Sequence, residues 1–200
     1  MKTITINSLL LGALLSLTQG TLAEAVFDLR GDAAQSRLNE LRATLKADAN
    51  NTQALKDAGI ILHQLNRGAP DKKLVEEGEK YLKLAVRNAA DDVETLAWLG
   101  SITTMKAQFD TDPGRQTFFV KSGSQKMDSA VRKAPDNQVV RLTRAYNSLE
   151  IPPFLKRTRF AVEDFQHYLK LCEQQTCADK DVAAAKQGLE QAQKIVAGNQ

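Results

Sequence analysis

The sequence predicts an all-α fold of stacked helical hairpins, and three observations lead to this prediction. Apolar residues recur at intervals of three and four through almost all of the chain after its first thirty residues or so. No segment alternates apolar and polar residues in the manner of a half-buried strand. Residues 78–92 (GEKYLKLAVRNAADD) share six of fifteen positions with residues 123–137 (GSQKMDSAVRKAPDN). Such self-similarity is typical of stacked supersecondary units.

The first residues have the features of a cleaved secretory signal. Lys2 gives a short positive region, residues 9–17 are apolar, and small and polar residues lead to Ala23, with a second cleavage site after Ala25. The apolar run is far shorter than the roughly 20 residues that a membrane-spanning helix needs, which disfavours the alternative of a retained anchor. We expect removal of residues 1–23, a periplasmic or secreted product, and no stable membrane insertion afterwards.

Eight helices are expected after the signal, each supported by a cap or by apolar spacing. In chain order the first four lie at about 32–49, from the cap-like Asn50-Asn51-Thr52 to the turn at 67–70, through Leu74 to near Ala89, and at 91–108. The next four lie from Asp112-Pro113 to Ala134, from Pro135-Asp136-Asn137 to the stop at Ile151-Pro152-Pro153, at about 154–171, and through Val182 to Gly198. The spacing residues are Ala34, Leu38, Leu41 and Leu45; Leu55, Ala58, Leu62 and Leu65; Leu74, Leu82 and Ala85; Val93, Leu96 and Leu99; Met127, Ala130 and Val131; Val139, Leu142, Tyr146 and Leu149; Ala161, Phe165 and Tyr168; and Val182, Ala185, Leu189, Ala192 and Val196.

Small residues recur where two helices of a hairpin would cross. Ala58-Gly59 follows Leu55 and Leu99-Gly100 follows Leu96, while Ala85 and Ala130 are 45 residues apart and Pro135 ends the second unit. Gly and Ala let neighbouring helices approach closely. On these residues the second to seventh helices resemble three hairpins of the tetratricopeptide repeat (TPR) family.

The resemblance implies a right-handed superhelix with this organisation: an N-terminal helix in residues 24–49, three TPR-like hairpins in residues 50–171, and a C-terminal capping helix in residues 172–200. The period here exceeds the usual 34 residues. The additional length is therefore expected in the loops near 66–73 and 108–118.

In TPR arrays the first helix of each hairpin lines a groove that holds protein segments. The positions that the resemblance assigns to this groove are Gln53, Lys56, Ile60 and His63 in the first unit and Glu94, Ala97, Ser101 and Thr104 in the second. Arg141 and Arg144 are candidate contacts for an anionic group of the partner. Alternatively, they form salt bridges to Glu163 or Asp164 on the next helix.

Three further features have two interpretations each. Cys172 and Cys177 can form a disulfide in an exported protein only if the helix ends between them, with Thr176 resembling the N-cap of the last helix. Phe118-Phe119 is either an exposed partner anchor or part of the core. The basic run at 156–159 either contacts an acidic partner or membrane surface, or is a solvated face.

Composition and spacing argue against several functional classes. Without residues 1–23, 26 basic and 24 acidic residues give a net charge of +2, which disfavours a nucleic-acid partner. His63 and His167 lie on different units without a nucleophile or carboxylate at a motif spacing. We therefore expect no enzyme activity, no metal and no cofactor, with a hydrolase that has a composite site as a remote alternative.

The leading hypothesis from the sequence is a non-enzymatic scaffold of the cell envelope that binds a protein or peptide segment. The alternative is a carrier that holds a small molecule or lipid in a cavity between the hairpins.

Overall fold

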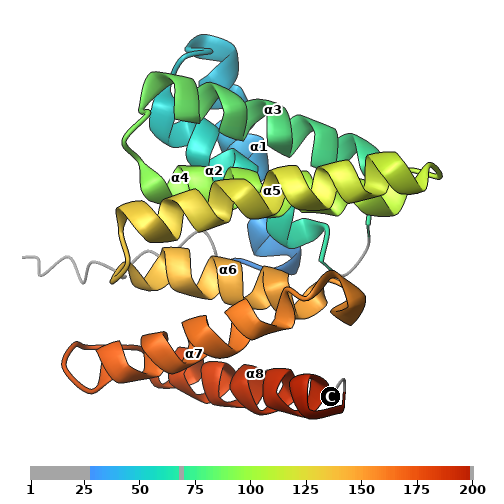
Figure 1. Cartoon of the computed structure of the whole chain (residues 1–200). Helices are drawn as coiled ribbons and strands as arrows, with labels where there is room; N and C mark the ends of the chain where they lie inside the picture. The colour runs from blue at the N-terminus through green and yellow to red at the C-terminus, as the bar shows by residue number, and fades with distance from the viewer. Residues whose placement is uncertain (1–27, 68–69, 199–200) are drawn as a thin grey trace, which may run out of the picture.

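Helices make up nearly all of the described part of the chain, residues 28–67 and 70–198, in the computed structural model (Figure 1). They are α1 (Gly31–Ala47), α2 (Thr52–Leu65), α3 (Lys72–Asn88), α4 (Val93–Met105), α5 (Pro113–Lys133), α6 (Gln138–Glu150), α7 (Thr158–Cys172) and α8 (Asp179–Gly198), with 3₁₀ turns η1 (Lys106–Phe109) and η2 (Pro153–Leu155). These residues contain no strand, so the prediction of an all-α fold is confirmed.

The predicted signal at residues 1–23 and its cleavage sites lie outside the described residues. Among the helices that are described, none combines the length and apolar character required to cross a membrane.

Side-chain caps determine where the helices begin. The side chains of Asn51, Asp92 and Asn137 each accept a hydrogen bond from the backbone N–H three residues ahead, at the starts of α2, α4 and α6. Asp112 caps α5 in the same way, with Pro113 as the first helical residue, as the sequence predicted. The first helix of each expected hairpin therefore starts with the same local device.

Neighbouring helices account for most of the packing. α2 packs on α3, α4 on α5, and α6 on α7, while α2 also contacts α4, α4 contacts α6, and α6 contacts α8. α1 covers α2 at one end and α8 covers α7 at the other, so that the helices succeed one another through the molecule (Figure 1). α2, α4, α6 and α8 consequently follow each other in a row.

Glycine pairs occupy the crossings within the first two hairpins. A Cβ on Gly78 would lie 3.5 Å from the carbonyl oxygen of Gly59 and closer still to Ile102. A Cβ on Gly123 would collide with the carbonyl oxygen of Gly100 and with Thr104. At the second crossing α4 and α5 approach this closely because Gly100 and Gly123 both lack a side chain, whereas at the first the glycines leave room for Leu82 and Ile102.

Four apolar clusters form the core, and each lies between adjacent helices. One joins α1, α2 and α3, the next α2, α3 and α4, the third α4, α5 and α6, and the last α6, α7 and α8. Phe165 of α7 belongs to the last cluster and packs against Gly188 of α8, where a Cβ would overlap its ring.

Several predicted boundaries were wrong. The first helix ends at Ala47 rather than residue 49, and the fourth ends at Met105, with η1 completing the segment to Phe109. Residues 113–118 lie in α5, so the additional length near 108–118 is mostly helix rather than loop. This outcome follows from Pro113, which is well suited to the first position of a helix.

The seventh helix begins at Thr158, not near residue 154. Pro152 and Pro153 lead into η2, and Lys156 then adopts the left-handed conformation with φ of 57°, which interrupts any helix. The last helix begins at Asp179, and the Ala178 carbonyl accepts its first hydrogen bonds. Thr176 is therefore not its N-cap.

A disulfide joins Cys172 and Cys177, with their Cα atoms 5.5 Å apart. Helix α7 ends at Cys172 and α8 starts at Asp179, so the chain turns between the two cysteines as the bond requires.

Candidate binding site between the hairpins

A cavity of about 390 Å³ lies along the row formed by α2, α4, α6 and α8, and we call it the inner cavity. Residues from all four helices line it: His63 and Gln64 of α2, Trp98 and Ser101 of α4, Leu142, Tyr146 and Asn147 of α6, and Asp181 and Ala184 of α8. The cavity exists because these helices follow one another and present one side chain every three or four residues to the same side.

Hydrogen bonds between buried polar side chains connect three of these helices beside the cavity. His63 Nε2 lies 2.8 Å from Ser101 Oγ. Asn147 Nδ2 donates to Ser101 Oγ at 3.2 Å and to Thr104 Oγ1 at 2.6 Å, and Thr104 Oγ1 donates to the Ser101 carbonyl at 2.7 Å. The network holds α2, α4 and α6 in one register.

His63 is neutral in this network. Burial, with smaller effects from the positive charges of Arg67 and Arg30, lowers the pKa of His63 from 6.5 to about 3. Its ring also meets Trp98 edge to face, with centroids 5.1 Å apart. At neutral pH the imidazole therefore serves as an uncharged hydrogen-bonding group.

Tyrosines from α6 and α7 add aromatic surface to the cavity. Tyr146 packs edge to face on Phe165 at 5.0 Å, and Tyr168 is fully buried. Burial and the nearby negative charge of Asp181 raise the pKa of both tyrosine hydroxyls, so both are neutral at physiological pH.

Three polar atoms of the lining have no protein hydrogen-bond partner in the described residues: His63 Nδ1, Gln64 Oε1 and Asn147 Oδ1. Each of these side chains has less than a tenth of its surface exposed. An unsatisfied buried polar group is unfavourable, so these three atoms are groups for which ordered water or another molecule would supply a partner.

The segment before α1 forms part of the wall. Asp28 and Arg30 line the inner cavity, and the Asp28 carboxylate pairs with Lys180 of α8 at 2.8 Å. This ion pair connects the segment before α1 to the first turn of α8.

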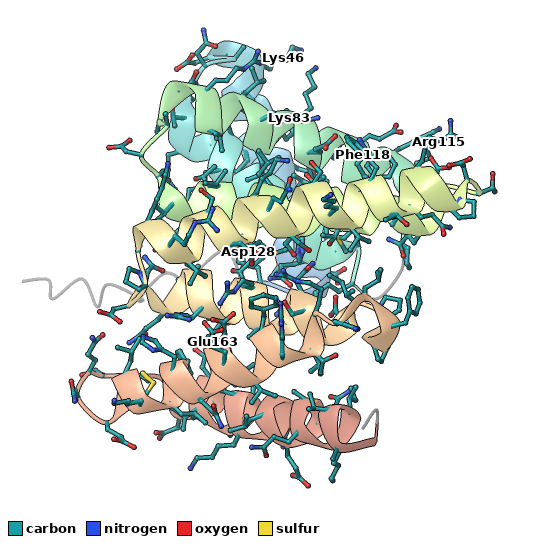
Figure 2. All side chains as sticks on the ribbon, in the orientation of Figure 1. Lys46, Lys83, Arg115, Phe118, Asp128 and Glu163 are labelled. Atoms are coloured by element: carbon teal, nitrogen blue, oxygen red, sulfur yellow. A yellow bond between two sulfur atoms is a disulfide. The ribbon has the colours of Figure 1, made fainter. Side chains whose placement is uncertain are left out.

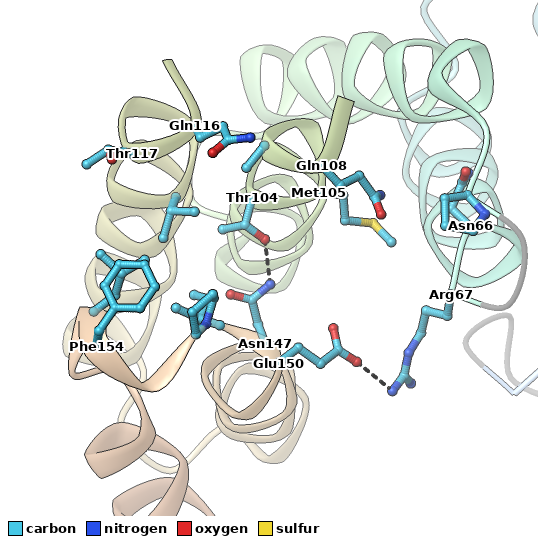
Figure 3. Close-up of a pocket in the computed structure, with 16 residues that line it drawn as sticks. Asn66, Arg67, Thr104, Met105, Gln108, Gln116, Thr117, Asn147, Glu150 and Phe154 are labelled. Carbon is cyan, nitrogen blue, oxygen red and sulfur yellow. Dashed lines mark hydrogen bonds and ion pairs between the residues drawn. The ribbon is translucent and has the colours of Figure 1, made fainter. Parts of the chain in front are cut away.

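A second cavity of about 420 Å³, the outer cavity, adjoins the first (Figure 3). Arg67, Asn147 and Glu150 line both. Arg67 pairs with Glu150 at 3.1 Å, and its guanidinium carbon lies 5.8 Å from the centroid of the Tyr146 ring. The two cavities therefore meet at the Arg67–Glu150 ion pair.

The structure places only some of the groove residues predicted from the TPR resemblance at these cavities. His63 and Ser101 line the inner cavity and Thr104 the outer one. Gln53 is exposed at the start of α2, where it donates to Asp57, and Ile60 packs in the core against Trp98. Neither of them lines a cavity.

The other predicted positions on α2 and α4 are engaged within the fold. Lys56 pairs with Asp92 at 3.0 Å and with Glu94 at 3.2 Å, and Glu94 also accepts from Asn137. Ala97 is buried in the cluster between α4, α5 and α6. The TPR alignment placed these positions on the groove, but here they hold neighbouring hairpins together.

Arg141 and Arg144 belong to an internal salt-bridge network, which is the second of the two interpretations that the sequence left open. Both pair with the fully buried Asp164, at 2.7 and 2.6 Å, and both contact Glu163. Arg144 also reaches Asp128, so that the network joins α5, α6 and α7 (Figure 2). Carboxylates of α5 and α7 therefore occupy these arginines, which confirms the internal salt bridges, while a contact with a partner's anionic group stays a prediction.

Sequence reasoning missed most of the inner cavity, namely Arg67, Trp98, Tyr146, Asn147, Glu150, Tyr168 and Asp181. Trp98, the single tryptophan, next to Leu99-Gly100 was an available indication. The sequence contains no comparable indication that Arg67 and Glu150, which are 83 residues apart, would pair.

No family model matches this chain, and no curated protein or solved structure matches it either. Within the described ranges, no three His, Cys, Asp or Glu side chains are grouped so that they could hold a metal ion.

Proposed function

We propose that this chain is an exported, non-enzymatic scaffold of the cell envelope that holds a protein or peptide segment in the inner cavity. The observation that carries the proposal is the position of the cavity along α2, α4, α6 and α8, with unpartnered polar atoms among its aromatic side chains. Peptide N–H and C=O groups are the partners that such amide and imidazole atoms take, and aromatic surface holds side chains.

The repeated features of the helices support a TPR-like arrangement. The same cap opens α2, α4 and α6, a glycine pair lies at each of the first two crossings, and the first helices of successive hairpins are in contact. In repeat proteins such a row of first helices forms an extended binding surface. The disulfide is consistent with an oxidising, extracytoplasmic compartment.

The geometry of His63 and Ser101 argues against a hydrolase. Their atoms are 2.8 Å apart, as in a nucleophile–base pair. A general base works best with a pKa near the operating pH, whereas the pKa of His63 is about 3. His63 Nδ1 also has no carboxylate partner among the described residues to orient the ring.

A small-molecule carrier is the second candidate. The volumes of about 390 and 420 Å³ fall within the range of small-ligand pockets, roughly 300–1,000 Å³. Mass spectrometry of the denatured native protein distinguishes the two functions. A small molecule or lipid released in a one-to-one ratio would favour the carrier.

Blocking the inner cavity tests the scaffold function. Random peptides are selected on the chain without residues 1–23, and the best peptide is titrated by calorimetry. Ala184→Phe fills the cavity from α8, and we expect at least about tenfold weaker binding, equivalent to 1.4 kcal/mol.

Ala183→Phe is the matched control, because Ala183 is the adjacent residue on the exposed side of α8. We expect it to bind the peptide like the unchanged protein. Equal affinities for the two variants, or a selection that yields no peptide, would contradict the proposed function.

A further inference from the structure

The outer cavity has an apolar interior and one aromatic side chain at its rim. Met105 of α4, Val120 of α5, and Ile151, Pro152 and Leu155 beyond α6 line it. Phe154 lies between Pro153 and Leu155 on the turn η2, and Figure 3 shows its ring at one side of the cavity, opposite Met105 and Arg67.

Polar side chains of the outer cavity are largely engaged within the protein. Asn66 donates to the Leu62 carbonyl and accepts from the Asp71 N–H, and Gln116 donates to the Asp110 carbonyl. Of the described residues that line the cavity, the charged ones are Arg67 and Glu150, which neutralise each other. The lining therefore suits an uncharged, apolar group.

Phe154 is exposed to an unusual degree and is held in a rigid position. Its relative exposure is 78%, and among residues 28–67 and 70–198 the other exposed large hydrophobic residue is Phe118 at 64%. Pro152 and Pro153 restrict the backbone before it, and the Pro152 and Pro153 carbonyls accept hydrogen bonds from the Leu155 and Lys156 N–H groups. The backbone that carries the Phe154 ring is therefore held in place by this turn.

We infer that the outer cavity is a second docking site, which takes a large apolar side chain of the same protein segment that the inner cavity holds. This inference rests on the proposed function. The two cavities share Arg67, Asn147 and Glu150, so a segment that leaves the inner cavity reaches the outer one directly. An exposed, preorganised aromatic residue beside a pocket is the usual form of an interface anchor.

N-acetyl-L-phenylalaninamide, which mimics one apolar residue of a peptide, is the probe for the test. It is titrated into ¹⁵N-labelled protein while amide chemical shifts are followed. We expect saturable shifts at Met105 and Val120, and about fivefold to tenfold weaker binding in Phe154→Ser. Phe118→Ser is the matched control, because Phe118 is similarly exposed on α5 but does not line the cavity (Figure 2).

Each outcome decides between the alternatives. No saturable shift at Met105 or Val120, or equal weakening by both serine variants, overturns the inference. Tighter binding of laurate than of the phenylalanine probe overturns it in favour of an alkyl ligand.

The selected peptide separates this inference from the proposed function. Loss of peptide binding in Ala184→Phe without loss in Phe154→Ser leaves the function intact and overturns the second site. Loss in Phe154→Ser alone supports the outer site and contradicts the role of the inner cavity.

Discussion

His63, Ser101, Thr104 and Asn147 form contacts between residues 38 to 46 positions apart in the sequence. All four side chains are polar and buried. His63 lies on α2, Ser101 and Thr104 lie on α4, and Asn147 lies on α6, so the contacts connect three successive hairpins. A buried network of this kind fixes the relative position of the helices, because displacement of one helix leaves several groups unsatisfied at once. His63, Ser101 and Asn147 also line the inner cavity, and Thr104 lines the outer one.

The buried His63 makes the stability of the protein depend on pH. Its pKa is about 3 in the folded state and 6.5 in an unfolded chain, so below pH 6.5 the unfolded state takes up a proton that the folded state does not. The free energy of unfolding therefore falls with pH between about 6.5 and 3. At pH 5 this loss amounts to about 2 kcal/mol relative to pH 7.

His63→Gln should remove that dependence, since glutamine does not titrate. Urea denaturation at pH 7 and pH 5 measures the effect in both proteins. Between pH 7 and pH 8 His63 is neutral in the folded state and nearly so in the unfolded one, so the difference between the two proteins should be almost constant there. If the variant loses as much free energy of unfolding between pH 7 and pH 5 as the unchanged protein does, His63 is not the group responsible.

At the scale of helices, the crossings of the hairpins depend on what surrounds each glycine. The Cβ of an alanine at position 123 would collide with the Gly100 carbonyl and with Thr104, including its backbone nitrogen. At position 59 the Cβ would instead meet the side chain of Leu82, with Cγ at 2.5 Å. A side chain can change its rotamer, but a backbone atom moves only with its helix.

Gly123→Ala should therefore lower the free energy of unfolding by about 2 kcal/mol, since overpacking typically costs 1–3 kcal/mol. For Gly59→Ala we expect a loss of less than about 1 kcal/mol, because the higher helix propensity of alanine offsets part of the strain. Chemical denaturation of the two variants measures both values. The reverse order would mean that α4 and α5 separate more easily than their contact implies.

At the scale of the whole molecule, the inner cavity is completed by an element outside the three hairpins. Helix α8 contributes Asp181 and Ala184 to the lining and pairs with Asp28 through Lys180. The position of α8 depends on its packing against α7 and on the disulfide just before its first turn. The capping helix is thus also one wall of the candidate site.

Removal of the disulfide should loosen that wall. Replacing both cysteines by alanine should lower the free energy of unfolding by about 2 kcal/mol, the value expected for a short closed loop. Hydrogen exchange should then show faster exchange in α8 than in the protein with the disulfide, while α2–α5 change little. Equal acceleration in all helices would contradict a local role of the bond.

The sequence by itself determined the helices and the starts of α2, α4 and α6. Apolar spacing and the caps at Asn51, Asp92 and Asn137 involve residues within one or two turns, and these local interactions define α2, α4 and α6. The spacing of Gly59 and Gly100 likewise reflects one crossing repeated in two hairpins. The disulfide was expected from the predicted export of the chain, and it forms because α7 ends at Cys172, before the second cysteine.

Only the tertiary structure decided which side chains face the cavities. The Arg67–Glu150 pair, the wall supplied by α8 and the use of Arg141 and Arg144 inside the protein depend on how whole helices rotate and cross. A rotation of one helix by a single residue, about 100°, exchanges lining residues for core residues, as at Leu62 and His63. Local spacing leaves that rotation open, and the packing of neighbouring hairpins determines it.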